Sequence, residues 1–483
     1  MTVSSADPLD RRTGIAVLDL GATHTRLMLF NGALRLVEQV SVPSEHVSDG
    51  PYPSLRLTQA TDLIREYWPR LDRLLPIAWL VPCAHGSALA LLNEAGNLAL
   101  PIMDYIAQPP EDVAEEYSVI APEYGEVFSP TNPAALTLGR QLLWQQRHFP
   151  VAFEQVTQIM PLAQYLGVLL GGQACSEITS LAAQTHLWDV RANKFSKLAV
   201  KQGWAQRFSP LLPAWAVSGI TNGGATQVLA GVHDSNANLL RYLVSGHDRF
   251  TLLSSGTWII GMANGASLSV LRPGHDLVSN TSVFGKAVPC CRFMGGEEYR
   301  VICDELGCEP IDTAAHSTQD EVVQALEAVF ESGAMALPAF TDSGGPIPGR
   351  GGCGRLVGVE GLDQSQKRAL AAVYCALMCV ESLEALEVTG KIIVDGPFAE
   401  NQPFLHALGL LMPTHPIYVS SLAEGTASGA AALAVLSASN GKLPRRSSFP
   451  LPLRPLSLTR LSTARLRASD YQQRWRQGLR SNV

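Results

Sequence analysis

Four short segments of this chain place acids, hydroxyls and glycines at the ends of apolar runs, where they could contact phosphate. The first is residues 19–26 (DLGATHTR). A turn of small residues lets backbone N–H groups approach phosphate oxygens, and an acid such as Asp19 can hold the water shell of Mg²⁺. The candidate nucleotide-binding residues of this turn are Gly21, Thr23, His24, Thr25 and Arg26, the last of which would supply positive charge. An ordinary hairpin turn is the alternative interpretation, and the pattern is not a Walker A loop.

The second segment, residues 254–258 (SSGTW), also follows an apolar run. It offers Gly256 and Thr257 as candidate phosphate contacts. Taken alone, it is equally consistent with a tight turn. Two such turns, each opening one half of the chain, favour the interpretation that each half supplies one phosphate loop.

The third segment, residues 230–237 (AGVHDSNA), places Asp234 just before an apolar stretch with helical periodicity. An Asp in this position is often only a helix N-cap, which is the structural alternative. Its functional interpretation is a general base that takes the proton from a hydroxyl as that hydroxyl attacks a phosphate.

The fourth segment, residues 394–401 (VDGPFAEN), leads from an apolar run through a glycine turn toward a helix. Such a turn can lay backbone against a flat base or a ribose. Gly396, Pro397 and Asn401 are therefore candidate nucleotide contacts. Simple strand-to-helix punctuation is the alternative.

The elements that must position these segments read as two related α/β halves, because the strand–turn–strand opening of the chain recurs near residue 250. The first half predicts strands at 15–20, 26–30, 34–41 and 76–84 and a helix at 58–71. The second predicts a strand pair within 249–263, strands at 391–396 and 416–420, and helices near 365–388, from 401 and at 424–436. We expect an N-terminal domain at 1–245, a second domain at 246–440, and a connector with a final helix at 441–483.

Residues 441–483 carry ten Lys or Arg against one acid. Such a basic tail could touch nucleic acid or membrane. Residues 469–479 (SDYQQRWRQGL) have the pattern of a capped amphipathic helix instead. We favour the interpretation that Tyr471, Trp475 and Leu479 pack this helix back on the protein.

The composition indicates a globular protein with sizeable cores, since 46% of its 483 residues are hydrophobic and 16% are charged. The net charge of −7 argues against general nucleic-acid binding. No apolar run is long enough to span a bilayer, and the polar first residues lack a signal-peptide core, so a cytoplasmic protein without a membrane partner is expected. The nine scattered cysteines favour reduced thiols over disulfides or zinc.

In their order and separations, the four segments resemble those of the FGGY carbohydrate kinases, and the resemblance covers nearly the whole chain. Asp19, Gly21, Thr23 and Arg26 match the family's first phosphate segment, D-x-G-x-T-x-x-R, and Gly256 and Thr257 match its second. Gly231, His233, Asp234 and Ala237 match the segment G-x-H-D-x-x-A, which carries the catalytic aspartate. The adenosine segment departs from the family, because Asp395 and Pro397 flank Gly396 where relatives are richer in glycine.

The resemblance implies two actin-like (ribonuclease-H-like) ATPase domains of the α/β class with an interdomain cleft that closes on substrate. It implies ATP and Mg²⁺ as cofactors, and phosphorylation of a terminal hydroxyl of a ketose or related polyol with Asp234 as the base. Residues 84–87 (AHGS) look like the family's sugar-lining M-H-G segment, and Asp104 stands near a Trp-x-Asp segment that here lacks its tryptophan. The residues implied to bind the sugar are His85, Gly86, Ser87, Asp104, His233 and Asp234.

Two interpretations of other classes stay open at this point. One is a non-catalytic, actin-like nucleotide switch, against which the His-Asp segment and the sugar-lining His85 both speak. The other is a degenerate kinase that senses a sugar, supported only by the unusual turn at 395–397. The sequence does not distinguish fuculose-, rhamnulose- and xylulose-type ketoses or tetritols, and a homodimer is the default oligomeric expectation.

Overall fold

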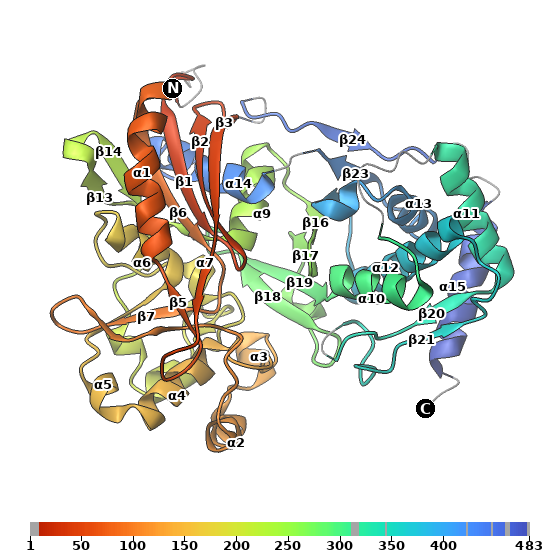
Figure 1. Ribbon diagram of the computed structural model, residues 1–483, viewed down its shortest axis with the longest axis horizontal. Helices are drawn as coiled ribbons and strands as arrows, with labels where there is room; N and C mark the ends of the chain where they lie inside the picture. The colour runs from red at the N-terminus through yellow and green to blue at the C-terminus, as the bar shows by residue number, and fades with distance from the viewer. Residues whose placement is uncertain are drawn as a thin grey trace. The chain divides into compact units, whose positions relative to one another are not determined.

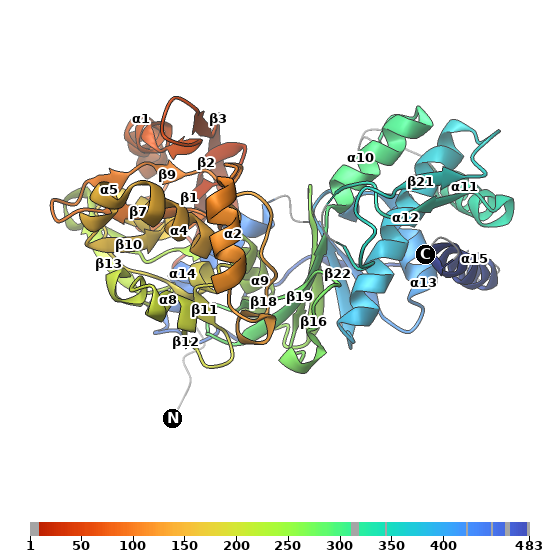
Figure 2. The same ribbon diagram turned by 90° about the horizontal axis from the view of Figure 1, so that it is seen from below.

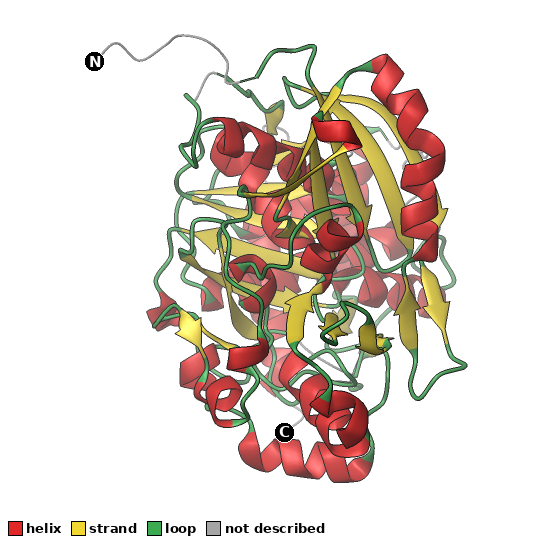
Figure 3. Cartoon of the chain, turned by 90° about the vertical axis from the view of Figure 1, so that its left-hand side faces the viewer, coloured by secondary structure: helices red, strands yellow, loops and turns green. Residues whose placement is uncertain are grey.

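The computed structural model describes residues 9–310, 318–342, 345–421, 424–445, 448–458 and 464–480. They form two compact units, whose elements are coloured along the chain in Figure 1 and by type in Figure 3. The first unit comprises residues up to 247 together with 279–287 and 424–451. The second comprises 248–278, 288–423 and the residues from 452 onward.

The first unit is built on a seven-stranded sheet with the order β13-β14-β6-β1-β2-β3, in which β15 also pairs with β6. Strands β1 and β2 form an antiparallel hairpin in which Asp19 lies opposite Arg26, and β6 runs parallel to β1. The strands are β1 (Gly14–Leu20), β2 (His24–Asn31), β3 (Leu36–Pro43), β6 (Ile77–Ala84), β13 (Val217–Thr221), β14 (Thr226–Leu229) and β15 (Val232–His233).

Strand β1 is buried along its whole length because helices cover both faces of this sheet. Ile15 and Val17 point into a core shared with α9 and α14, whereas Ala16 and Leu18 point into a second core shared with α1 and α6. This alternation follows from the two-residue period of a strand. The helices are α1 (Thr58–Leu74), α6 (Leu162–Leu169), α9 (Asp234–Val244) and α14 (Gly425–Ala438).

A third core of the first unit gathers mainly segments between β6 and β13, with Trp204 and Tyr117 fully buried in it. The remaining strands of the first unit are β4 (Glu45–Val47), β5 (Ser54–Arg56), β7 (Leu89–Leu92), β8 (Leu98–Leu100), β9 (Ile102–Met103), β10 (Gln158–Pro161), β11 (Trp188–Asp189) and β12 (Lys194–Phe195). The remaining α-helices of this unit are α2 (Glu111–Ile120), α3 (Tyr124–Val127), α4 (Leu138–His148), α5 (Pro150–Glu154), α7 (Ile178–Leu181) and α8 (Lys197–Lys201).

The second unit has its own seven-stranded sheet, of order β18-β19-β17-β16-β22-β23-β24. Helices α11, α12, α13 and α15 contact one another beside it, as Figure 2 shows. Its strands are β16 (Phe250–Ser255), β17 (Ile259–Asn264), β18 (Leu277–Thr281), β19 (Ala287–Phe293), β20 (Met335–Leu337), β21 (Arg355–Val357), β22 (Lys391–Asp395), β23 (Ile417–Ser420) and β24 (Leu453–Pro455). Its helices are α10 (Gly295–Leu306), α11 (Gln319–Ser332), α12 (Gln364–Ala385), α13 (Gln402–Leu411) and α15 (Ala464–Arg480).

The two sheets repeat one topology. In the first, the order β3-β2-β1-β6-β14 joins two antiparallel pairs to two parallel pairs. In the second, β19-β17-β16-β22-β23 does the same. The related halves expected from the sequence are therefore present as two sheets with equivalent strand order.

The limits of the compact units differ from the expected domain limits at two segments. Helix α14 was expected in the second domain (246–440), but it packs on α9 and β6 of the first unit. It is apolar on all sides, and a side chain at Gly429 would lie 1.8 Å from the Ala237 carbonyl oxygen, so α9 and α14 touch through their backbones. Residues 279–287 also belong to the first unit. The assignment of sugar to one domain and nucleotide to the other stays a prediction.

The basic C-terminal residues fold back on the second unit. Tyr471 and Trp475 of α15 are fully buried and donate hydrogen bonds to the carbonyls of Ala334 and Ala336. Arg476 pairs with Glu381 and Glu384. The predicted packing of this helix is confirmed, although Leu479 is only half-buried and the helix begins at Ala464, so that Ser469 lies inside it and is not its cap. None of the helices in the described ranges is long and apolar enough to cross a membrane.

Candidate active site

Asp234 is the first residue of α9, which starts directly after the short strand β15. The N-cap position belongs to His233, whose side chain makes no capping hydrogen bond. The Asp234 carboxylate accepts hydrogen bonds from the N–H and the hydroxyl of Ser235, and about a third of its side chain stays exposed. Asp234 is therefore not the N-cap that the structural alternative required, and its carboxylate is open to a ligand.

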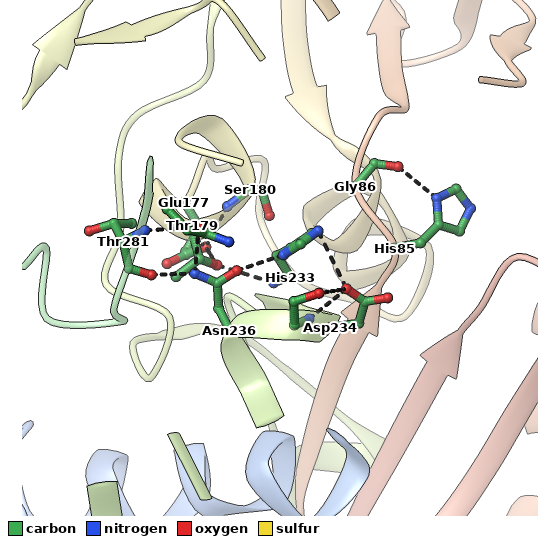
Figure 4. A network of polar contacts seen from close by, with 11 residues as sticks. His85, Gly86, Glu177, Thr179, Ser180, His233, Asp234, Asn236 and Thr281 are labelled. Carbon is green, nitrogen blue, oxygen red and sulfur yellow. Dashed lines mark hydrogen bonds and ion pairs between the residues drawn. The ribbon is translucent and has the colours of Figure 1, made fainter. Parts of the chain in front are cut away.

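His233 links Asp234 to the predicted sugar segment. Its Nε2 atom lies 3.4 Å from Asp234 Oδ1. A side chain at Gly86 would come within 2.8 Å of the same Nε2 atom. Gly86 is thus required by the close approach of the His233 ring, and the segments carrying Asp234 and His85 are packed together in the first unit (Figure 4).

The ring of His233 is oriented by Asn236, one turn along α9. Asn236 Nδ2 donates to Asn280 Oδ1 at 2.9 Å and to the Thr281 carbonyl, so its Oδ1 atom faces His233 Nδ1 at 2.6 Å. An amide oxygen only accepts, and therefore Nδ1 must carry the proton. This fixes the ring with Nε2 toward the Asp234 carboxylate.

His85 is also held in one tautomer. Its Nδ1 atom lies 2.6 Å from the Gly86 carbonyl oxygen and must donate to it. Burial lowers the pKa of His85, which favours the neutral ring. The Nε2 lone pair is then left as an acceptor, and this atom is buried with no hydrogen-bond partner among the described residues. An acceptor of this kind suits a substrate hydroxyl.

Ser87, the third predicted residue of this segment, has a left-handed backbone conformation with φ of 62°. Its carbonyl accepts a hydrogen bond from the buried amide of Gln141 on α4, which also binds the Ala135 carbonyl. Gln141 therefore fixes the turn that carries His85, a role that the sequence pattern did not indicate.

Asp19 is the last residue but one of β1, and only 7% of its surface is exposed. Burial, followed by the charges of Asp234 and Glu424, raises the pKa of its carboxyl to about 7, while Arg26 acts in the opposite direction. A hydrated cation would relieve this crowding of acids. The described residues contain no cluster of three or more side chains suited to a metal. A site with a single carboxylate still fits Mg²⁺, because this ion keeps several waters and binds through one or two carboxylates plus phosphates.

The turn after Asp19 differs from the expectation at Thr25. Gly21 N–H bonds to the His24 carbonyl and closes the turn, leaving Thr23 and His24 exposed. The Thr25 side chain is instead buried and lies 3.3 Å from the hydroxyl of Ser44, which holds the Gly21 carbonyl. Thr25 supports the turn from inside and is not placed to donate to a phosphate. The strand period explains this, since Thr25 and Arg26 must point to opposite faces.

Asp104 is fully buried, in contrast to the expected direct contact with sugar. Its carboxylate lies 2.6 Å from His46 Nδ1, and His46 Nε2 lies 2.8 Å from the Ala22 carbonyl. Both ring atoms face acceptors, and the hydrogen bond to Asp104 raises the pKa of His46. The pair therefore ties the segment around Asp104 to the turn that follows Asp19.

Four of the five predicted nucleotide residues of the second unit line one cavity of about 340 Å³, and the fifth, Gly396, does not. Its walls are Gly256, Thr257, Gly296, Glu297, Tyr299, Arg300, Pro310, Pro397, Phe398, Glu400 and Asn401. Segments 254–258 and 395–401, far apart in the sequence, meet here because β16 and β22 are parallel neighbours. A larger cavity of about 560 Å³ lies in the first unit around β5 and α6, and none of the predicted residues lines it.

Ser255 joins the two turns of this cavity, because its hydroxyl donates to the Asp395 carbonyl and accepts from Phe398 N–H. Gly396 has φ of 83°, and a side chain there would lie 2.1 Å from the Ser255 carbonyl oxygen. It is therefore required for the turn and does not itself line the cavity. Asn401 caps α13 through its Oδ1 atom, which leaves its amide nitrogen for a ligand.

The start of α10 was missed by sequence reasoning. Gly296, Glu297, Tyr299 and Arg300 contribute a wall of the cavity, and Tyr299 packs edge-on against Phe398 with ring centroids 5.5 Å apart. The signal was the Gly-Gly-Glu-Glu run at 295–298 directly after an apolar stretch. A side chain at Gly296 would lie 2.1 Å from the Gly256 carbonyl oxygen, so this glycine pair is a close backbone contact.

Comparison with known proteins places carbohydrate kinases among the proteins most similar to this chain. The family model described as Carbohydrate kinase FGGY, C-terminal domain, matches residues 247–443. The crystal structure of a carbohydrate kinase from Novosphingobium aromaticivorans is 30% identical, with a TM-score of 0.84, and covers 97% of this chain and 99% of its own. Among curated proteins, no relative matches.

More distant structures share the fold. A xyloylose kinase from Brucella ovis is 17% identical with a TM-score of 0.79, covering 97% of this chain and 99% of its own. A gluconate kinase from Lactobacillus acidophilus is 16% identical with a TM-score of 0.75, covering 96% of each chain. The two repeated sheets are thus those of the actin-like, ribonuclease-H-like α/β fold, as the sequence predicted.

Proposed function

Because this chain belongs to the FGGY family of carbohydrate kinases and is therefore a phosphotransferase, we propose that it transfers the γ-phosphate of ATP to a terminal hydroxyl of a ketose or related polyol, with Asp234 as the general base. The specific acceptor class and the role of Asp234 are the proposed parts. Both rest on the residues around the start of α9.

The observation that carries the proposal is the grouping of Asp234 with the segment around His85 in the first unit. The Asp234 carboxylate is partly exposed, whereas the rings of His233 and His85 beside it are buried or half-buried and are fixed by hydrogen bonds. His85 offers a lone acceptor on Nε2, which suits a neighbouring hydroxyl of the same substrate. A polyhydroxylated acceptor needs several such fixed partners, while a nucleotide switch would need none of them.

In the proposed reaction, the acceptor O–H donates to an Asp234 oxygen and its proton passes to that carboxylate as the oxygen bonds to the γ-phosphorus. The bond to the bridging oxygen breaks and ADP leaves with that electron pair. Because a sugar hydroxyl is a weak nucleophile at neutral pH, a positioned base accelerates this step. Backbone N–H groups of the turn after Asp19, together with Arg26, would stabilise the charge on the transferring group.

We assign the nucleotide to the cavity of the second unit. Gly256 and Gly296 present backbone without side chains, which lets phosphate oxygens approach N–H groups. Tyr299 and Phe398 offer aromatic surface for a flat base. Transfer requires the γ-phosphate to reach the hydroxyl beside Asp234, and we therefore propose that the two units close on their substrates and exclude water.

Asp19, through water, is the residue that would hold Mg²⁺. When bound, the ion would neutralise charge on the β- and γ-phosphates. The Asp19 side chain lies at the end of β1, and the Arg26 side chain starts opposite it on β2. This chain would thus keep a carboxylate for the hydrated ion and a guanidinium for the phosphate on adjacent strands.

A coupled ADP-release assay over a panel of ketoses, polyols and sugar acids tests the proposal. We expect turnover that depends on a ketose or polyol and is negligible with ATP alone. Turnover with sugar acids only would contradict the proposed acceptor class. Turnover that is equal with and without any acceptor would contradict sugar phosphorylation as the activity.

A further inference from the structure

Glu177 is a fully buried carboxylate close to the catalytic segment. It stands at the N-cap of the short helix α7, where its Oε2 atom accepts from Thr179 N–H at 2.9 Å, Ser180 N–H at 3.3 Å and the Thr179 hydroxyl at 2.5 Å. Its second oxygen, Oε1, is buried with no hydrogen-bond partner among the described residues. An ordinary serine or threonine cap would satisfy the same N–H groups without burying a carboxylate.

The Thr179 hydroxyl connects Glu177 to the backbone that precedes Asp234. Its proton must point at the Glu177 carboxylate, because the same oxygen accepts the His233 N–H at 3.1 Å. A hydroxyl has one proton and two lone pairs, so donating to Glu177 fixes the lone pair that receives His233. Figure 4 draws this chain of contacts from Glu177 through Thr179 to His233.

We propose that Glu177 and Thr179 are positioning residues that hold the backbone of His233, and through it the Asp234 carboxylate, in the geometry for proton abstraction. This inference rests on the proposed role of Asp234. It adds a second anchor to the one that Asn236 makes with the His233 ring. His233 is then held by its main chain from α7 and by its side chain from α9.

The cost of burying Glu177 supports a role beyond capping. Burial raises the pKa of this carboxyl to about 7, with the bonds from Thr179 acting in the opposite direction. A proton taken up near neutral pH would have Oε1 available, so Oε2 would keep accepting from Thr179 in either state. The anchor is therefore expected to work across the neutral pH range.

The test compares Thr179→Val with Thr179→Ser. Valine removes the hydroxyl at nearly equal size, whereas serine keeps it. Because a small misplacement of a catalytic group raises the barrier without weakening ground-state binding, we expect Thr179→Val to lower kcat about tenfold or more with both KM values within about twofold. Thr179→Ser should stay within about threefold of the parent in kcat.

Ser176→Ala is the matched control. Ser176 is also fully buried and adjacent to Glu177, but its hydroxyl has no hydrogen-bond partner in the described part of the chain. It should leave kcat at the parental value. Thermal unfolding of each variant checks folding, and Thr179→Ala removes the hydroxyl a second way should valine prevent folding. Parental kcat in a folded Thr179→Val or Thr179→Ala protein overturns the inference.

A double variant separates this inference from the proposed function. If Thr179 acts through Asp234, Thr179→Val should cause no further loss in an Asp234→Asn background. A further tenfold loss there overturns the positioning role while leaving the base role intact. Parental kcat in Asp234→Asn alone would instead contradict the proposed function, whatever Thr179 does.

Discussion

The two candidate sites of this protein are built by different means. Around Asp234, hydrogen bonds from side chains fix the site: Asn236 holds the His233 ring, and Gln141 holds the backbone of the turn that carries His85. In the cavity of the second unit, the predicted contacts are mostly backbone, brought close by Gly256, Gly296 and Gly396. An acceptor with several similar hydroxyls requires directed partners, whereas phosphates accept any N–H that can approach.

The difference predicts how each site responds to substitution. Removing a polar atom near Asp234 should alter turnover, because the remaining groups lose their orientation. Adding a side chain to the glycine cavity should obstruct the nucleotide, provided the fold has room for it. Gly256 has that room, since the nearest atom to an added Cβ is the Trp258 carbonyl oxygen at 3.9 Å.

The largest effect is expected for Asp234→Asn. Asparagine keeps the size and much of the hydrogen bonding but loses the charge and basicity. We expect kcat to fall by roughly a hundredfold or more while the KM values change little, as measured by steady-state ADP release.

Asp363→Asn is the matched control for Asp234. The Asp363 carboxylate is a true N-cap that accepts from Ser365 and Gln366 N–H groups, and asparagine caps about as well. It should leave kcat unchanged. If Asp234→Asn behaves like Asp363→Asn in a folded protein, Asp234 is not the base and the contrast between the two sites fails.

The next largest effect is expected for Gly256→Val in the second unit. The protein can accommodate the Cβ, but the side chain would face the cavity, so the KM for ATP should rise about tenfold or turnover should be lost. Sugar binding, measured by calorimetry without nucleotide, should be largely unaffected. Parental ATP kinetics would show that this turn does not contact the nucleotide.

Gly296→Ala sharpens the same comparison. Its added methyl would lie 2.1 Å from the Gly256 carbonyl oxygen, so the backbone of the cavity must move. We expect the melting temperature of Gly296→Ala to be lower than that of the parent, and that of Gly256→Val to be unchanged. Equal melting temperatures for both would contradict the close backbone contact between the two glycines.

The sequence predicted the elements and the backbone turns better than the side-chain partners. The strand–turn–strand repeat and the four segments are local patterns, and each lies at the expected element junction. The roles of His46, Gln141 and Asn236 depend on contacts between elements, which local patterns do not encode. The burial of Asp104 has the same cause, since it follows from packing and not from the motif. The burial of Thr25 follows instead from the two-residue period of β2, a local pattern that the sequence does contain.

Helix α14 illustrates the limit for domain assignment. Its Ala-rich sequence predicts a buried helix but contains no mark of the partner on which it packs. The partner is α9. The carbonyl of Ala237 on α9 can approach α14 closely because Gly429 has no side chain. The pairing is thus a property of two segments almost 200 positions apart.

A smaller effect is expected for Asn236→Ala. This variant removes the acceptor that keeps the proton on His233 Nδ1, so the ring can take the other tautomer. Since a neutral hydrogen bond contributes about 0.5–1.5 kcal/mol, we expect kcat to fall by about tenfold at most. Selective ¹⁵N labelling of histidine should report loss of the Nδ1–H signal of His233. An unchanged signal would contradict the role assigned to Asn236.

The smallest effect is expected for the stability of the first unit at pH 5, through the buried side chain of His186. His186 is buried between the Tyr117 hydroxyl and the carbonyls of Ser129 and Pro130, and burial lowers its pKa from 6.5 to about 4. Between these values the unfolded chain binds a proton that the folded one excludes, so stability present above pH 6.5 is lost as the pH falls toward 4.

Asparagine tolerates the left-handed backbone at this position, where φ is 64°. His186→Asn should therefore fold but show a smaller drop in melting temperature between pH 7 and pH 5 than the parent. Because every other titrating group is shared, the difference between the two proteins isolates this histidine. An equal drop in both proteins would show that protonation of His186 does not contribute to the loss of stability between pH 7 and pH 5.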